Sequence, residues 1–163
     1  MLTVVKADKT STRGQRNVLD GELELLEGFD FNIDGKLSTT IFFPYAATID
    51  RVTGALKVSV PAFVPSASVM APEGSTHLRL ISGGASIDFE SGVFEVVTSQ
   101  SADTAINQVQ VAAFEMLNQL TANSTKPLFL VLGVEFYQQV NGVNYPLKNG
   151  NNNALSLVKV LGL

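Results

Sequence analysis

The sequence contains no cysteine and no tryptophan, and it has a single histidine. Without cysteine the chain can form no disulfide and supply no thiolate, which fits a reducing compartment. Structural zinc sites need four Cys or His ligands and catalytic sites usually need three, counting a carboxylate, so one histidine argues against zinc. The missing cysteine pair and tryptophan also remove the hallmarks of antibody domains.

Basic residues and long apolar runs are scarce as well. The chain has 11 Lys and Arg against 15 Asp and Glu, a net charge of −4 and a pI near 4.9. Nucleic-acid binding depends on clustered basic residues, so we expect no nucleic-acid partner. No window approaches the roughly 18 apolar residues of a membrane span, and we expect no membrane association. Residues 1–16 lack the apolar core of an export signal, which favours the cytoplasm if the chain is full length.

Length and composition predict one folded domain over residues 1–163. Apolar residues make up 45% of the chain and charged residues only 16%, so there is enough apolar surface to offset the entropy lost on folding. Within this domain, the polar stretch of residues 7–17 is predicted to be a flexible loop.

Short apolar runs are separated by a polar residue followed by glycine. Four such pairs are Asp34-Gly35, Thr53-Gly54, Ser91-Gly92 and Asn141-Gly142. Glycine reaches positive φ without a Cβ clash, so these pairs favour the tight turns that join antiparallel strands. The chain is therefore predicted to form a series of hairpins.

The apolar runs predict short strands along most of the chain. We expect them over residues 2–6, 21–27, 37–43, 47–52, 55–60, 76–82, 86–97, 128–137, 143–147 and 154–161. The run over 128–137 is the most apolar and is placed at the centre of a sheet, because a strand covered on both faces shows little alternation. Residues 108–117 fit a strand and a helix, and their β surroundings favour the strand.

These strands and turn signals predict an all-β fold, an antiparallel two-sheet β-sandwich that is immunoglobulin-like in the general sense of its architecture. A β-barrel is the alternative. The proline-rich stretch over residues 61–72 is expected to be an extended connection, and Ser82-Gly83-Gly84 a turn or bulge.

A candidate calcium site lies in residues 30–38. Oxygen ligands at alternate positions ahead of a glycine resemble the first half of an EF-hand or dockerin-type loop, and they belong to Asp30, Asn32 and Asp34. Position twelve of such a loop is Ile41 instead of a bidentate carboxylate. The alternative is a strand over residues 29–34 whose apolar side chains point inward and whose polar side chains face water. Calcium is the one cofactor that the sequence suggests.

Catalytic chemistry has little support in the sequence. A serine mechanism would have to use His77 with Ser75, Ser82 or Ser86, but no nucleophile elbow accompanies them. Carboxylates two apart on a strand share a face and could form an acid and base pair. The candidates are Glu22 with Glu24, Asp88 with Glu90, and Asp50 next to Arg51. No catalytic residue is assigned.

The stretch TKPLFLVLGVEFYQQVNGVNYPLKNG, residues 125–150, resembles that of small, functionally unassigned all-β proteins of Bacteroidota. The resemblance implies a bacterial source. It brings no catalytic residues with it.

The sequence favours a non-enzymatic structural or protein-binding module whose partner is another protein or a second copy of the chain. Association would use loops or edge strands, with residues 2–5 and 154–163 as candidate edges. The alternative is a carbohydrate or small-ligand binding module that uses Tyr45, Tyr137 and Tyr145. A hydrolase with a carboxylate site is the lesser alternative.

Overall fold

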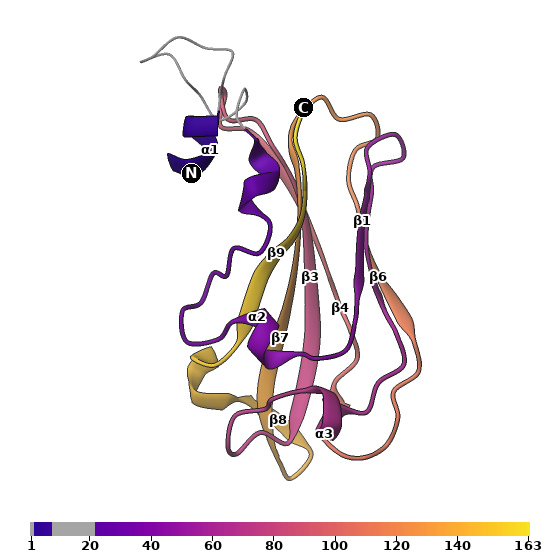
Figure 1. Cartoon of the computed structure of the whole chain (residues 1–163). Coiled ribbons are helices and arrows are strands. Elements are labelled where there is room, and N and C mark those ends of the chain that lie inside the picture. The colour runs from indigo at the N-terminus through magenta and orange to yellow at the C-terminus, as the bar shows by residue number, and fades with distance from the viewer. Residues whose placement is uncertain (1, 8–21) are drawn as a thin grey trace.

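The computed structural model describes residues 2–7 and 22–163, and it consists of two antiparallel sheets packed face to face (Figure 1). The strands are β1 (Ala46–Asp50), β2 (Ala55–Val60), β3 (His77–Ile87), β4 (Phe94–Gln100), β5 (Thr104–Ala105), β6 (Phe114–Gln119), β7 (Leu128–Val140), β8 (Val143–Pro146) and β9 (Ala154–Leu161). The helices are α1 (Leu2–Ala7), η1 (Leu23–Leu26), α2 (Leu37–Thr40), α3 (Pro65–Ser68) and η2 (Leu147–Gly150). The predicted all-β sandwich is confirmed.

The small sheet has the strand order β1-β2-β6, and the large sheet has the order β4-β3-β7-β8. The short strand β5 also pairs with β3, and β9 also pairs with β7. The two strands β3 and β7 therefore form the middle of the large sheet, while β4 and β5 lie on one side of them and β8 and β9 on the other.

Strand β7 lies at the centre of the large sheet, as predicted. Its even-numbered side chains point to the small sheet and are at most 1% exposed; they belong to Leu128, Leu130, Leu132, Val134 and Phe136. They pack against Leu56 and Val58 of β2 and against Leu78 and Leu80 of β3 in one apolar cluster. Burial of this inner face is the main apolar contribution to folding.

Glycine-closed turns join several of the strands as predicted. Asn141 and Gly142 have φ values of 50° and 79° and form a two-residue turn, since Val140 pairs directly with Val143. Gly92, at a φ of 73°, lies between β3 and β4. The β1–β2 hairpin is also present, but its loop spans four residues, 51–54. Asp34-Gly35 joins no strands; it lies between η1 and α2.

The strands predicted in the first 43 residues are wrong. Residues 2–6 lie in helix α1, residues 23–26 form the 3-10 helix η1, and residues 37–40 form helix α2. Of the loop predicted over 7–17, Ala7 ends α1 and residues 8–17 lie outside the described residues.

The physical reason is that residues 24–31 cover the outer edge of β9. The N–H of Gly28 donates to the carbonyl of Leu157, and the N–H of Leu157 donates to the carbonyl of Phe29, at 2.7 and 2.9 Å. Carboxylates satisfy two further N–H groups: Glu27 accepts from Val160 and Glu24 from Gly162. Glu24 and Glu27 of this segment therefore bind an existing sheet edge instead of facing water from a strand of their own.

Three predictions farther along the chain need correction. Ser82-Gly83-Gly84 is no turn but the middle of β3, where a Cβ on Gly84 would come within 3.0 Å of Asn118 Cβ in the facing sheet. The strand predicted over 108–117 begins only at Phe114; before it, Val111 makes an isolated bridge to Phe63. The proline-rich connection over 61–72 contains the helical turn α3.

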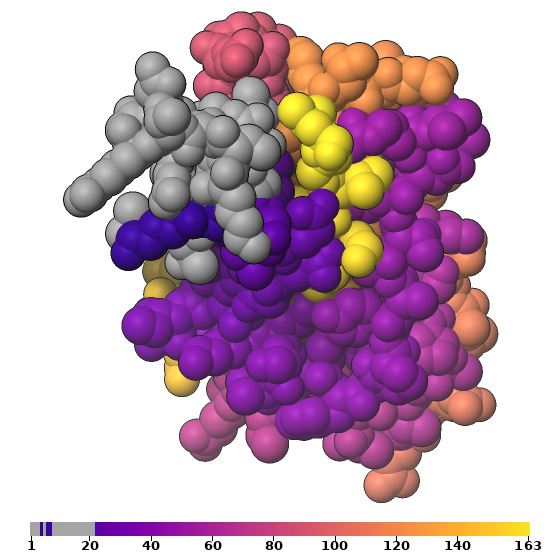
Figure 2. Space-filling model, turned by 45° about the horizontal axis from the view of Figure 1, so that its top comes forward, coloured from indigo at the N-terminus to yellow at the C-terminus, as the bar shows by residue number. Residues whose placement is uncertain are grey.

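Arg51 ties together three segments at one end of the sandwich. Its guanidinium donates to the carbonyl oxygens of Ser124 and Lys126 ahead of β7, and to those of Leu161 and Gly162 at the end of β9. Figure 2 shows the yellow C-terminal residues between the indigo N-terminal segment and the purple residues around the β1–β2 loop. A planar group with several donors suits such a cluster of carbonyls.

None of the helices in the described ranges has the length and apolar character needed to cross a membrane.

We predict that Arg51→Leu lowers the free energy of unfolding by about 2 kcal/mol, because partly buried carbonyls lose a charged donor. Arg51→Lys should recover part of this loss, since an ammonium reaches fewer of the four oxygens. Urea unfolding measures both, with Lys57→Leu as the control, because Lys57 forms an exposed ion pair with Glu115 of little expected value. An Arg51→Leu variant as stable as the control would contradict this role.

Candidate functional site

The large sheet has an outer face, turned away from the small sheet, that is built from the odd-numbered residues of β3 and β7. Residues of these strands that pair directly lie side by side on this face: Arg79 with Glu135, and His77 with Tyr137. Because side chains alternate along a strand, the even-numbered neighbours point into the core. Part of this face forms a second apolar cluster, in which Phe129, Leu157 and Val160 pack with Val4 of α1 and Leu23 of η1. The remaining side chains of the face are half-buried or exposed.

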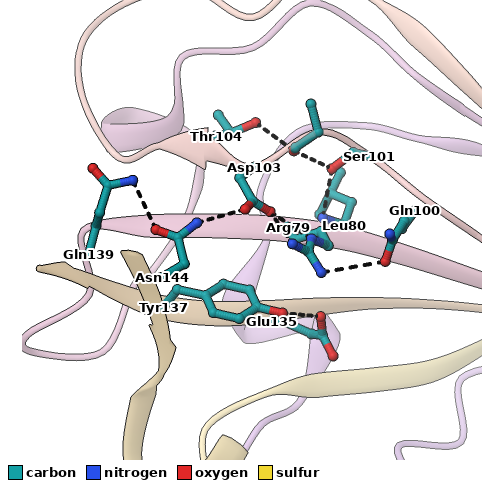
Figure 3. Close-up of polar contacts among 11 residues, drawn as sticks. Arg79, Leu80, Gln100, Ser101, Asp103, Thr104, Glu135, Tyr137, Gln139 and Asn144 are labelled. Carbon is teal, nitrogen blue, oxygen red and sulfur yellow. Dashed lines mark hydrogen bonds and ion pairs between the residues drawn. The ribbon is translucent and has the colours of Figure 1, made fainter. Parts of the chain in front are cut away.

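A polar cluster occupies one end of the outer face (Figure 3). Asp103, in the loop between β4 and β5, accepts from the guanidinium of Arg79 at 2.6 Å through one carboxylate oxygen. Its other oxygen accepts from the side-chain amide of Asn144 on β8, also at 2.6 Å. Gln139 of β7 in turn donates to Asn144 at 2.9 Å. The cluster therefore joins strands from both sides of the sheet.

Tyr137 is the second anchor of this cluster. Its hydroxyl donates to the carboxylate of Glu135 at 2.6 Å, and the guanidinium of Arg79 lies 5.1 Å from the centre of its ring. Burial and the neighbouring Glu135 carboxylate raise the pKa of Tyr137 to about 12. The hydrogen bond with Asp103 raises the pKa of Arg79. The two groups thus stay in their protonated forms at neutral pH.

A hollow of about 630 Å³ extends from this cluster toward the middle of the outer face. Its floor contains Gly83, and its walls include Ile81, Val131 and Leu155. Close packing requires glycine at nearby position 133, because a Cβ there would come within 2.5 Å of the carbonyl oxygen of Ala154.

An apolar hollow of about 360 Å³ continues the surface at the other end. Nine apolar residues line it: Leu26, Phe29, Phe31, Ala85, Ile87, Phe89, Phe129, Val131 and Leu157. Val131 lines both hollows, so they lie next to each other on the same face, and we call the two together the outer groove. It runs from the Arg79, Glu135 and Tyr137 cluster to the phenylalanines at 29, 31 and 89.

Phe29 and Phe31 lie at the surface, where they are 55% and 57% exposed. Their rings meet edge to face, with centroids 5.2 Å apart. The expectation that Phe29, Phe31 and Ile33 point inward is therefore wrong: the 29–34 segment lies over the edge of β9, and its apolar side chains line the groove or face water.

Strand β4 borders the outer face, at the edge of the large sheet (Figure 1). Phe94 and Val96 on this strand are 68% and 54% exposed, and the side chains of Thr98 and Gln100 are exposed as well. The exposed apolar surface of the outer face thus continues to this edge.

The candidate calcium ligands make separate backbone contacts. Asp30 accepts from the N–H of Leu37, and Asn32 donates its amide to the carbonyls of Asn151 and Asn153. The Asn32 oxygen accepts from the N–H of Asp34. Within residues 2–7 and 22–163, no three His, Cys, Asp or Glu side chains are grouped so that they could hold a metal. Calcium binding by these residues stays a prediction.

The residues considered for catalysis are dispersed. Ser82 and Ser86 point into the core, where Ser82 accepts from Asn118 and Ser86 contacts Ser124, whereas His77 belongs to the outer face. Ser75 donates to the carbonyl of Pro72.

The paired carboxylates cap backbone N–H groups. Asp88 accepts from Ser91 and Glu90, and Asp50 from Thr53 and Val52. These hydrogen bonds lower the pKa of both carboxyl groups, whereas a general acid needs a raised pKa. Glu24 serves the edge of β9.

The three tyrosines lie in different places. Tyr137 belongs to the outer groove, and Tyr45 lines a separate hollow with Pro44 and Pro61. Tyr145 is on β8, where it pairs with Gln138. Their positions therefore do not favour one sugar site built from all three tyrosines. Carbohydrate binding stays a prediction.

The sequence reading missed the Arg79, Asp103 and Glu135 cluster, although one signal was present. Glu135 is the only charged residue in the apolar run 128–137, and Arg79 alternates with Leu78 and Leu80 in the neighbouring strand. A charge at an alternating position in each of two strands would have suggested a pair. The register that places them side by side depends on the whole sheet.

We predict that Tyr137 titrates near pH 12 and that Glu135→Gln moves its pKa back toward the ordinary value of 10.0. Because the folded-state pKa is raised, the associated stability is fully present below pH 10 and is lost as the pH rises through 12. Tyr137→Phe should flatten this alkaline decline. NMR titration of labelled tyrosine and unfolding at several pH values measure the two effects, and a Tyr137 that titrates at 10 would contradict the contact.

No protein-family model, curated protein or solved structure matches the chain. The resemblance of residues 125–150 to Bacteroidota proteins stays a prediction. The function is therefore inferred from the outer groove and from the edge of β4.

Proposed function

We propose that the chain is a non-enzymatic protein-binding module that uses the outer groove and the adjoining edge of β4. The proposal includes the bacterial source and the general immunoglobulin-like architecture expected from the sequence and, if the chain is full length, a cytoplasmic location. The observation that carries it is the apolar lining of the outer face, which is exposed at Phe29, Phe31, Phe94 and Val96 and half-buried between them at Ala85 and Ile87. Contiguous apolar surface of this kind marks interaction sites in folded proteins.

The groove suits a polypeptide better than a small polar ligand. Its apolar end is lined only by hydrocarbon side chains. Its opposite end carries the guanidinium of Arg79 and the carboxylates of Asp103 and Glu135. An apolar segment with a polar or charged continuation matches both ends. Aromatic and aliphatic anchors supply the binding energy of such interfaces, and the polar end supplies orientation.

The edge of β4 adds main-chain hydrogen bonding to these side-chain contacts. An extended segment that pairs with β4 would continue the large sheet and place alternate side chains beside Phe94 and Val96. Natural edge strands usually carry Lys, Pro or a bulge, which prevent pairing with another chain. The β4 sequence FEVVTSQ contains no Lys, Arg or Pro.

We predict that peptides selected from a displayed random library bind the full chain on the outer face and carry alternating apolar residues. Phe31→Ser and Phe94→Ser should each weaken binding of a selected synthetic peptide by about tenfold, since each removes an exposed aromatic anchor. Both residues lie at the surface, so the fold should survive.

Val52→Ser is the matched control, because Val52 is an exposed apolar residue in the β1–β2 loop and lines neither hollow of the outer groove. It should leave the peptide affinity unchanged. Peptides that bind equally well to all variants, or a selection that enriches nothing for this face, would reject the proposed function.

A further inference from the structure

We infer that the occupant of the β4 edge is β4 of a second copy of this chain, paired antiparallel about a two-fold axis at Val97. This inference rests on the proposed function and names the partner of the same surface. The combined assembly would be a continuous sheet running through both copies.

The hydrogen-bond pattern between β3 and β4 shows which groups the edge offers. Ser101 donates to the carbonyl of Leu80, and Asp88 donates to the carbonyl of Val93, at 2.9 and 2.8 Å. Hydrogen-bonded pairs alternate along an antiparallel ladder, so the odd-numbered residues of β4 bond to β3. The N–H and C=O groups of the even-numbered residues point outward, that is, away from β3 in the plane of the sheet. These residues are Phe94, Val96, Thr98 and Gln100.

None of these four outward N–H groups has a hydrogen-bond partner among residues 2–7 and 22–163. The opposite side of the large sheet is different, because Glu24, Glu27 and residues 28–31 occupy the outer edge of β9. The candidate edge over residues 154–163 is therefore covered, and residues 2–5 are helical. Of the two long outer strands of the large sheet, β4 and β9, only β4 therefore has outward groups without a hydrogen-bond partner in the described part of the chain, although β6 of the small sheet lies close to it.

The four outward residues determine the register of self-pairing. With the axis at Val97, Phe94 faces Gln100 of the second copy and Val96 faces its Thr98, so all four exchange backbone hydrogen bonds. A shift of the axis to Val96 or Thr98 leaves outward groups unpaired. The interface is isologous, as a two-fold dimer requires.

The charges favour the same register. Glu95 is the only charged residue of β4, and an axis at Val97 places it opposite Ser99 of the second copy, away from the other Glu95. In this register each Glu95 keeps the hydrogen bond from the N–H of Thr121 in its own copy and meets no second carboxylate.

Because the chain has no cysteine, one substitution tests the register directly. At the two-fold axis the two copies of residue 97 form a non-hydrogen-bonded pair, with Cα atoms about 4.5 Å apart, within the range of a disulfide. Val97→Cys should therefore oxidise to a covalent dimer at micromolar concentration. Leu117→Cys, on edge strand β6, is the matched control and should stay largely monomeric.

Thr98→Pro tests the same pairing without a cross-link. Proline removes an outward N–H that makes no bond to β3, so the folded monomer should persist. In sedimentation equilibrium the wild type should dimerise, and Thr98→Pro should weaken the dimer by about tenfold or more. Val96→Lys should also weaken the dimer, and it replaces Thr98→Pro in this test if the proline variant does not fold.

A wild type that stays monomeric across the micromolar range, or a Val97→Cys variant that cross-links no faster than Leu117→Cys, would overturn self-pairing. Selected peptides would still bind the outer face in that case, and the proposed function would stand. Loss of peptide binding at the outer face would reject the proposed function whatever the oligomeric state.

Discussion

The structure depends on the position of β7, which is hydrogen-bonded along both edges and buried on its inner face. Pairing with β3 on one side and with β9 and β8 on the other leaves its backbone groups satisfied. Its even-numbered side chains then form the core with the small sheet, and its odd-numbered side chains line the outer groove. A one-residue slip of β7 would exchange these two sets, so the core and the groove specify the same register.

The two sides of the large sheet differ in how their edges are satisfied. At β9, the segment that contains Glu24 and Glu27 supplies carbonyls and carboxylates to the outward N–H groups. At β4, Glu95 instead serves the N–H of Thr121, which follows β6 in the small sheet. The acidic residues therefore close one edge and leave the other open. That asymmetry, together with the apolar side chains of the outer face, is the basis on which we propose a binding function.

The sequence predicted those parts of the fold that depend on local chemistry or on burial from all sides. The Asn141-Gly142 turn, the strand at 154–161 and the central strand at 128–137 are examples. Segments whose partners lie far away in the chain were missed. The alternation over residues 21–27 matches a strand, but its carboxylates are used at the edge of β9, more than a hundred residues away. Gly83 and Gly84 resemble a turn, yet they permit close packing inside β3.

The candidate site was harder to predict for the same reason. Asp103, Arg79 and Glu135 come from three separate segments, and only the sheet register brings them together. The sequence also does not reveal that β4 is an edge strand, because this depends on which other strands pair with it in the folded sheet.

The most direct test of this account is residue-level amide hydrogen exchange in β4 at low and high protein concentration. The account predicts that the amides of Glu95, Val97 and Ser99 are protected at both concentrations, because they bond to β3. Protection at high concentration alone is expected for the outward amides of Phe94, Val96, Thr98 and Gln100. Outward amides whose exchange does not change with concentration would contradict the claim that β4 is a free edge that pairs with a second copy.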